Sequence, residues 1–174
     1  KRVTCTSHVY FPALMNGREN LYPLLEDLRA SLQKEGVEIE LDLGAEYRVG
    51  EYMLSLIERG EILSGDEKRV LVEHNFLSPS PFFDQVVFEL QARGYEVVLA
   101  HPERYVFWAD DIVRHGEELK NKNCRLQVNI LSFAGYYGKE AQRGAERLHD
   151  AGLIDYYAGD VHGMRHVEAI TKYL

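Results

Sequence analysis

Short stretches rich in β-branched and aliphatic residues alternate along this chain with longer amphipathic stretches. The short stretches predict strands and the longer ones predict helices, since each follows the hydrophobic period of that element. We expect strands at residues 2–6, 37–43, 69–72, 96–99, 125–130 and 155–158. We expect helices near residues 19–34, 51–59, 81–93, 110–121, 139–151 and 164–173. This alternation predicts an α/β fold built on parallel strands joined by helices.

Local signals agree with these helix bounds. The first predicted helix carries an apolar stripe suited to packing on a sheet, formed by Leu21, Leu24, Leu25, Leu28 and Leu32. Pro81 stands near the start of the third helix, where a missing N–H does no harm. Four helices are followed by a glycine typical of a helix C-terminus: Gly36, Gly60, Gly94 and Gly152. No Pro/Gly/Ser-rich linker divides the chain, so we expect one domain over residues 1–174.

Polar side chains that can bind metals follow the predicted strands. In chain order they are His8, Glu46, Glu73, His101, Asn129 and the pair Asp160 and His162. From Glu46 onward they recur every 27 to 31 residues, which is the length of one strand–helix unit. The C-terminal ends of parallel strands converge on one mouth in such folds. His, Glu and Asp side chains there offer the nitrogen and oxygen ligands that Mn, Fe or Zn accept, so we predict a divalent metal site.

Each of these residues also has an ordinary structural interpretation. A single histidine after a strand more often caps or hydrogen-bonds than binds a metal. Glu46 and Glu73 can be acids at helix N-termini, where the helix dipole favours them. For Asn129 we prefer a role in tying down its loop. The recurrence of ligand-type residues at five of the six strand ends favours the metal interpretation for the other positions.

Two motifs supply cations beside these positions. In His101-Pro102-Glu103-Arg104-Tyr105, we expect Arg104 to bind phosphate, because a guanidinium offers a planar fork of donors that stays charged. The alternative is a surface ion pair made by Glu103. In Asp160-Val161-His162, both ligand-type side chains lie on one side of an extended segment, and Arg165 follows as a second candidate cation.

Two further segments have open roles. The stretch 132–139, with two glycines around Tyr136 and Tyr137, can form a backbone cradle for an anion or a loop whose tyrosines pack on the rim. Tyr10, Tyr47 and Arg48 can shape a substrate pocket, although core or rim packing is the more common role of such aromatic residues.

Composition narrows the class of protein. The 174 residues, 45% hydrophobic and 28% charged, are those of an ordinary globular protein, and we expect a cytoplasmic one. A net charge of -8 argues against a general nucleic-acid binder, and no apolar run has the length of a membrane span. We expect Cys5 and Cys124 to be reduced. A phosphate substrate would require local cations to overcome the net negative charge of the protein.

The motifs together resemble the PHP (polymerase and histidinol phosphatase) superfamily, and within it the bacterial tyrosine-protein phosphatases of capsule and exopolysaccharide loci. The segments that carry the resemblance are Thr6-Ser7-His8, Gly44-Ala45-Glu46-Tyr47-Arg48, Leu71-Val72-Glu73, His101-Pro102-Glu103-Arg104-Tyr105 and Asp160-Val161-His162. The resemblance covers the whole chain. It implies a distorted TIM-like (βα) barrel, up to three metals (Mn, with Fe or Zn as alternatives), and hydrolysis of phosphotyrosine on a tyrosine autokinase.

The resemblance also implies a role for each candidate residue. Glu46, Glu73 and His101 would hold one metal, with Glu46 bridging to another. His8 and His162 would help to hold the second metal, and Asp160 would serve the remaining one. Arg104 would bind the phosphate, with Arg165 as a second cation.

One element of the family pattern is not in this sequence. The family opens with a DxHxH strand, and nothing before His8 supplies it, so the chain is one strand–helix unit short of the family's barrel. The chain begins without Met inside a predicted strand, and we therefore expect residues upstream of Lys1.

The sequence leaves three functions open. The first is a metal-dependent protein-tyrosine phosphatase, in which metals activate water and an arginine stabilises the transition state. The second is a related phosphoesterase acting on a small phosphomonoester. The third is a non-catalytic domain that binds a kinase tail; the missing motif favours it, and the six retained ligand-type residues weigh against it.

Overall fold

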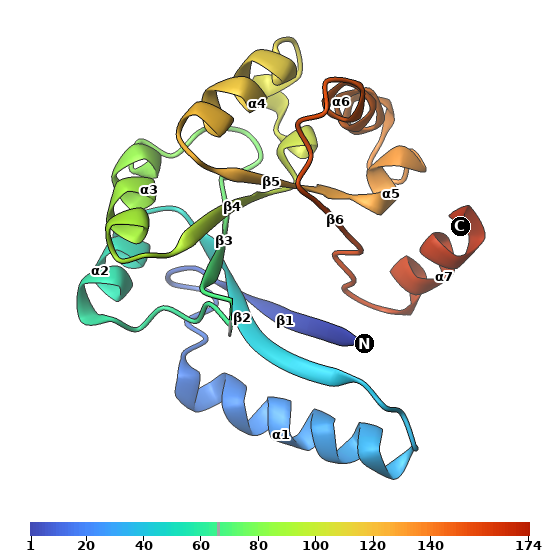
Figure 1. Ribbon diagram of the computed structural model, residues 1–174. Helices are drawn as coiled ribbons and strands as arrows, with labels where there is room; N and C mark the ends of the chain where they lie inside the picture. The colour runs from blue at the N-terminus through green and yellow to red at the C-terminus, as the bar shows by residue number, and fades with distance from the viewer. Residues whose placement is uncertain (66) are drawn as a thin grey trace. The chain divides into compact units, whose positions relative to one another are not determined.

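The computed structural model describes residues 1–65 and 67–174 of the chain. These residues form two compact units. Unit 1 comprises Lys1–Glu73 and Ser80–Val97, and unit 2 comprises His74–Pro79 and Val98–Leu174. Strand β4 (Glu96–Ala100) begins in unit 1 and ends in unit 2. Figure 1 shows the course of the chain within each unit.

Unit 1 is built on parallel strands with helices between them. Its elements are β1 (Arg2–Val9), α1 (Arg18–Lys34), β2 (Glu40–Arg48), α2 (Glu51–Arg59), β3 (Arg69–Glu73) and α3 (Phe83–Ala92). Strand β2 lies between β1 and β3, and both neighbours run parallel to it. The core of unit 1 includes Leu43, Val70 and Val72, whose burial is typical of parallel strands covered on both faces, and Leu90 of α3.

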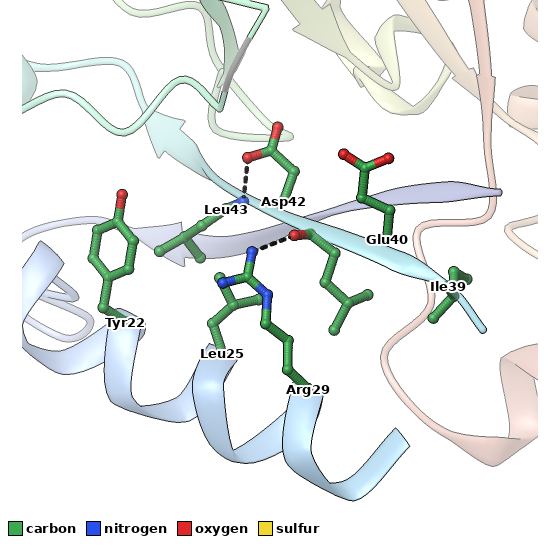
Figure 2. Close-up of a pocket in the computed structure, with 8 residues that line it drawn as sticks. Tyr22, Leu25, Arg29, Ile39, Glu40, Asp42 and Leu43 are labelled. Atoms are coloured by element: carbon green, nitrogen blue, oxygen red, sulfur yellow. Dashed lines mark hydrogen bonds between the residues drawn. The ribbon is translucent and has the colours of Figure 1, made fainter. Parts of the chain in front are cut away.

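Helix α1 packs beside β2 and buries only part of its apolar stripe (Figure 1). Leu21 and Leu25 are buried, whereas Leu24 and Leu28 are exposed. A cavity of 330 Å³ lies along this contact (Figure 2), and the guanidinium of Arg29 donates a hydrogen bond across it to the backbone oxygen of Leu41. The cavity contains none of the predicted site residues.

Unit 2 repeats the same construction. After β4 come two 3-10 helices, η1 (Pro102–Arg104) and η2 (Val106–Trp108), followed by α4 (Ile112–Asn121) and β5 (Arg125–Asn129). Helices α5 (Ile130–Phe133) and α6 (Lys139–Asp150), strand β6 (Tyr156–Ala158) and helix α7 (Met164–Tyr173) complete it. Strand β5 pairs in parallel with β4 and with β6. Leu126, Val128 and Leu148 form part of its core.

The predicted α/β fold with six parallel strands is confirmed, and α2 and α7 have the predicted bounds. The four glycines after helices all have positive φ angles, from 67° to 79°. Other bounds differ. The ladder between β1 and β2 continues to the pair Val9 and Tyr47, so both strands run past their predicted ends. His8 and Glu46 therefore lie within strands rather than after them.

None of the helices in the described part of the chain combines the length and apolar character needed to cross a membrane.

Candidate functional site

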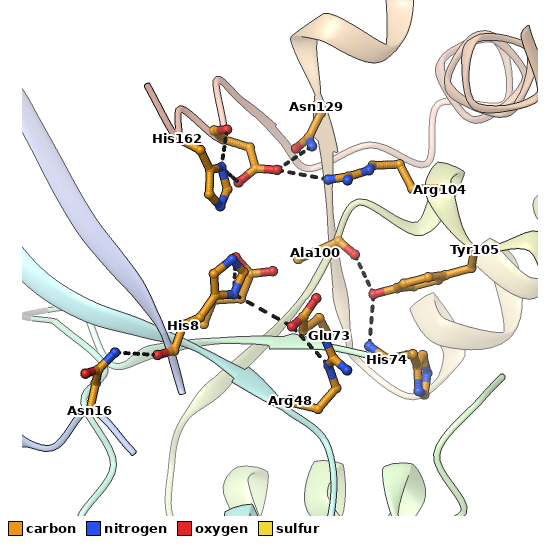
Figure 3. Close-up of polar contacts among 12 residues, drawn as sticks. His8, Asn16, Arg48, Glu73, His74, Ala100, Arg104, Tyr105, Asn129 and His162 are labelled. Atoms are coloured by element: carbon orange, nitrogen blue, oxygen red, sulfur yellow. Dashed lines mark hydrogen bonds and ion pairs between the residues drawn. The ribbon is translucent and has the colours of Figure 1, made fainter. Parts of the chain in front are cut away.

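Three of the predicted metal ligands meet in unit 1. His8, Glu46 and Glu73 each offer a ligand atom, and these atoms lie within 4.8 Å of one another (Figure 3). The Nδ1 atom of His8 is 3.8 Å from Oε2 of Glu46 and 3.7 Å from Oε1 of Glu73. Glu46 and Glu73 are 3% and 1% exposed, so two carboxylates are buried side by side. Buried charges of this kind require compensation, and a cation between them would provide it.

Strand register explains why these residues meet. His8 of β1 stands opposite Glu46 of β2 in the parallel ladder, which places both side chains on the same face. Glu46 pairs in turn with Leu71 of β3, and Glu73 is two residues beyond Leu71, on that same face. Three residues that are far apart in the sequence thus gather at the C-terminal end of the unit 1 strands.

Arg48 brings a positive charge to this cluster. Its Nε donates a hydrogen bond of 3.0 Å to Oε1 of Glu73, and its guanidinium lies 5.1 Å from the ring centre of Tyr10. The two carboxylates carry more negative charge than the single guanidinium of Arg48 balances. One imidazole and two carboxylates are also a ligand set that Mn, Fe and Zn accept, so the residues present fit the metal that the resemblance implies.

Tyr47 takes the structural role that the sequence left open for it. Its side chain is 1% exposed, and its hydroxyl accepts a 2.7 Å hydrogen bond from the backbone N–H of Leu63. Burial raises the pKa of this hydroxyl to about 12, although the hydrogen bond from Leu63 favours the ionised form. Tyr47 is therefore a core residue that anchors a loop. Tyr10, in contrast, lies against Arg48.

Arg104 is the centre of a second cluster, in unit 2. Its Nη1 donates a 3.1 Å hydrogen bond to Oδ2 of Asp160, which also accepts a 2.8 Å bond from Nδ2 of Asn129 (Figure 3). Its guanidinium lies between two aromatic rings, those of Phe76 and Tyr137. Asp160, predicted as a metal ligand, is thus held by a cation and an amide in this structure.

His162 and His101, the two other histidines predicted as ligands, both belong to unit 2. His162 is exposed, and its Nδ1 is 2.9 Å from the backbone oxygen of Asp160. His101 is 2% exposed, and its backbone N–H donates to the oxygen of Gln127 at 2.7 Å. His101 and Asp160 have positive φ angles, 38° and 45°, which side-chain-bearing residues seldom adopt. Such strained residues concentrate at functional sites.

Glu103 corrects one interpretation from the sequence. The surface ion pair considered for it is wrong, because Glu103 is 5% exposed. Its Oε1 accepts hydrogen bonds from Ser132 Oγ at 2.6 Å and from the Asn129 N–H at 3.0 Å. Burial raises the pKa of Glu103, and the two hydrogen bonds counteract part of that rise. The role preferred for Asn129, tying down its loop, agrees with these contacts.

His74 and Tyr105 have contacts that the sequence did not predict, although Tyr105 ends the His101–Tyr105 motif. The Tyr105 hydroxyl donates to the oxygen of Ala100 at 2.8 Å and accepts the N–H of His74 at 3.1 Å. His74 is surrounded edge-on by the rings of Tyr105, Phe107 and Trp108, and burial lowers its pKa to about 4. The sequence signal for these contacts was the run of aromatic residues after the HPER motif. Hydrophobic periodicity does not predict how such a run packs.

Arg165 lies on the exposed surface of α7. In the part of the chain that the structure describes, it makes no hydrogen bond or ion pair, and the second-cation role stays a prediction. The segment 132–139 divides into the end of α5, a turn and the start of α6. In that turn Tyr137 packs on Arg104, which agrees with the interpretation of the loop as one that positions aromatic residues.

The strand–helix alternation and the imidazole–carboxylate cluster define an α/β protein with a candidate metal centre. The chain belongs to the CpsB/CapC family of capsular polysaccharide synthesis, whose model matches residues 1–169. The resemblance seen in its motifs is thereby confirmed.

Individual relatives agree with this family. The chain is 31% identical over 143 residues to the tyrosine-protein phosphatase YwqE of Bacillus subtilis (strain 168), covering 80% of this chain and 55% of YwqE. It is 25% identical over 176 residues to CapC of Staphylococcus aureus, covering 99% of this chain and 68% of CapC. The chain therefore corresponds to only part of each relative's length.

A solved structure extends the comparison to the fold. One chain from the crystal structures of YwqE from Bacillus subtilis and CpsB from Streptococcus pneumoniae matches with a TM-score of 0.85 and 26% identity. The match covers 97% of this chain and 70% of that one. Those proteins are described as unique metal-dependent tyrosine phosphatases.

Proposed function

We propose that this chain carries the catalytic residues of a metal-dependent protein-tyrosine phosphatase. The observation that carries the proposal is the cluster of His8, Glu46 and Glu73, two buried carboxylates and an imidazole with ligand atoms within 4.8 Å. Its support is the family membership and the similarity to relatives described as metal-dependent tyrosine phosphatases. The substrate would be a phosphotyrosine protein of capsule synthesis, and we propose a tyrosine autokinase.

His8, Glu46 and Glu73 would hold a divalent metal, with Mn proposed first and Fe or Zn as alternatives. His101, Asp160 and His162 would be the further ligands, as the family resemblance implies. When bound, such metals neutralise phosphate oxygens and lower the pKa of water. Bound metal cations would also make the local electrostatic field positive. They would thereby allow a phosphate to bind to a protein with a net charge of -8.

Arg104 would bind the phosphate through the donors that Asp160 does not take. A guanidinium has five N–H donors, and Nη1 already donates to Asp160 at 3.1 Å. Within the described residues, Nε and Nη2 have no protein acceptor. These two nitrogens form the fork that matches two phosphate oxygens. Arg104 would thereby stabilise the charge that develops on the phosphoryl group.

The test is phosphate release from a phosphotyrosine peptide in the presence of Mn²⁺. We expect turnover that a chelator abolishes and added metal restores. Activity that survives complete metal removal would contradict the proposal. A panel of small phosphomonoesters and a phosphoserine peptide, run in parallel, checks the substrate class: a higher kcat/KM on the small esters would assign the site to them instead. Tight peptide binding without turnover in Mn²⁺ would indicate a binding domain.

A further inference from the structure

The guanidinium of Arg104 is held between two aromatic rings. Its central carbon lies 4.6 Å from the ring centre of Phe76 and 4.1 Å from that of Tyr137. Both distances are within the range of about 6 Å for attraction between a cation and a ring face. A guanidinium also stacks on aromatic faces through its flat surface, which leaves its N–H donors directed outward along the edge.

The two rings are themselves fixed by the fold. The backbone oxygen of Phe76 accepts the N–H of Val106 at 3.1 Å, and its ring packs 5.3 Å from that of His101. Tyr137 lies in the turn between α5 and α6, where its ring contacts that of Tyr136 at 5.2 Å. The rings therefore come from separate segments of unit 2, and each has partners other than Arg104.

Besides the two ring contacts, Arg104 makes a hydrogen bond at the edge of its guanidinium. Asp160 accepts the hydrogen bond from Nη1, and Asn129 holds the same carboxylate oxygen. Phe76, Arg104 and Tyr137 all line a cavity of 660 Å³ in unit 2, so the arginine is accessible to a ligand. In the described part of the chain, the hydroxyl of Tyr137 is buried without a hydrogen-bond partner, which indicates that its ring rather than its hydroxyl makes the contact with the protein.

We propose that Phe76 and Tyr137 are positioning residues that form an aromatic clamp on Arg104. The inference rests on the proposed function, in which Arg104 binds the phosphate. A free arginine side chain has many rotamers, and a ligand must bear the entropic cost of selecting one. The clamp fixes the guanidinium before the phosphate arrives, with Asp160 setting its rotation in the plane. The phosphate then meets a fork already in the orientation for binding.

The test compares three variants of the Mn²⁺-loaded protein: Phe76→Leu, Tyr137→Leu and Tyr137→Phe. Turnover of a phosphotyrosine peptide and inhibition by inorganic phosphate are measured for each. We expect each leucine variant to lower kcat/KM and phosphate affinity about 3- to 10-fold, the effect of losing one partly buried cation–ring contact. Tyr137→Phe keeps the ring, so it should stay within about twofold of the wild type.

A double-mutant cycle with Arg104→Ala separates the clamp from general damage. If the rings act through Arg104, then Tyr137→Leu has no further effect once Arg104 is replaced. An equal loss in both backgrounds would overturn the proposal, as would a loss in Tyr137→Phe equal to that in Tyr137→Leu. Metal content should be unchanged in all variants. Should Tyr137→Leu fold poorly, Phe76→Leu provides the same cycle.

Phosphate binding also distinguishes this inference from the proposed function. The protein could show no turnover on any phosphoester and still bind phosphate with an affinity that depends on both Arg104 and the rings. That result would support the clamp and contradict the proposed phosphatase activity. Phosphate affinity that is unaffected by Arg104→Ala rejects the clamp, whatever the turnover.

Discussion

Arg48 and His8 approach the same oxygen of Glu73. Nε of Arg48 donates to Oε1 at 3.0 Å, and Nδ1 of His8 lies 3.7 Å from that atom. The Arg48 cation beside this oxygen compensates part of the cost of burying a carboxylate that is 1% exposed. The cluster is therefore arranged around negative charge, and it should lose its affinity for a cation when that charge is removed.

Replacing Glu73 by Gln tests this directly. The change keeps the shape of the side chain but removes its charge and leaves Arg48 without its anionic partner. We expect the divalent metal affinity and kcat/KM to fall by more than the roughly 10- to 100-fold typical of residues that only orient a ligand. Metal titration and phosphate release measure the two effects.

Glu96→Gln is the matched control for this substitution. Glu96 accepts a hydrogen bond from Arg69 at 2.8 Å on the surface of unit 1, and exposed ion pairs contribute little to stability. It should bind metal as the wild type does. Unchanged metal affinity in Glu73→Gln would remove Glu73 from the ligand set.

Metal binding should also stabilise the folded chain. A ligand that binds only the folded state adds about 2.7 kcal/mol at 100 times its Kd, which for a chain of this size raises Tm by about 5–10 °C. Thermal unfolding with and without Mn²⁺ measures the shift. Glu46→Gln should abolish most of it, and an equal shift in this variant would place the metal elsewhere.

The sequence predicted the order of elements because each helix and strand has its own hydrophobic period. Strand ends were less predictable: the ladder that carries β1 and β2 on to Val9 and Tyr47 depends on pairing between segments. His8, Glu46 and Glu73 were each singled out as candidate ligands, because parallel strands place their C-terminal residues at one edge, although the family resemblance grouped Glu46 and Glu73 with His101 and placed His8 at a second metal. The pairing of Asp160 with Arg104 was not, since residues 56 positions apart leave no local signal.

Asp155 should make the stability of the chain depend on pH. Burial opposes its ionisation, but hydrogen bonds from Lys120, the Leu126 N–H (2.8 Å) and Arg125 (3.1 Å) outweigh burial and lower its pKa. A carboxylate with a lowered folded pKa stabilises the protein above its unfolded pKa, about 3.9, and that stability is lost as pH falls through the folded value.

The substitution Asp155→Asn should therefore cost about 1–3 kcal/mol at neutral pH, the range for hydrogen bonds to a charged group. Denaturant unfolding from pH 7 down to pH 3 should show this difference shrinking below about pH 4. Asp150→Asn, at an exposed residue of α6, provides the control. A difference between D155N and wild type that stays constant with pH would contradict the assignment of the charge.

Gly144 permits the close approach of α6 to η1. A methyl group there would lie 3.2 Å from Cβ of Glu103 and 3.2 Å from Cδ1 of Ile112. Gly144→Ala gains about 1 kcal/mol of helix propensity, but the crowding costs about 1–3 kcal/mol. We expect a net loss in the free energy of unfolding, measured in urea. Arg143→Ala, on the exposed side of the same helix, should change stability little; stabilisation by G144A would show that the helix can shift.

The aromatic contacts of Arg104 could not be predicted from the sequence. The HPER motif indicated a cation, and the glycine-bracketed tyrosines indicated a loop of open role. Only packing in unit 2 brings the rings of Tyr137 and Phe76 against that cation. Such contacts depend on where loops fold back, and loops have no period from which their contacts can be predicted.

The left-handed backbone of His101, with φ at 38° and ψ at 53°, sets stability against the metal-binding role proposed for this residue. A histidine in this conformation costs of the order of 1–3 kcal/mol that glycine, or in part asparagine, would recover. Directed evolution for heat resistance alone would accordingly favour His101→Gly or His101→Asn and discard the imidazole. The histidine present here therefore lowers durability, a cost that the metal-binding role proposed for its imidazole would offset in activity.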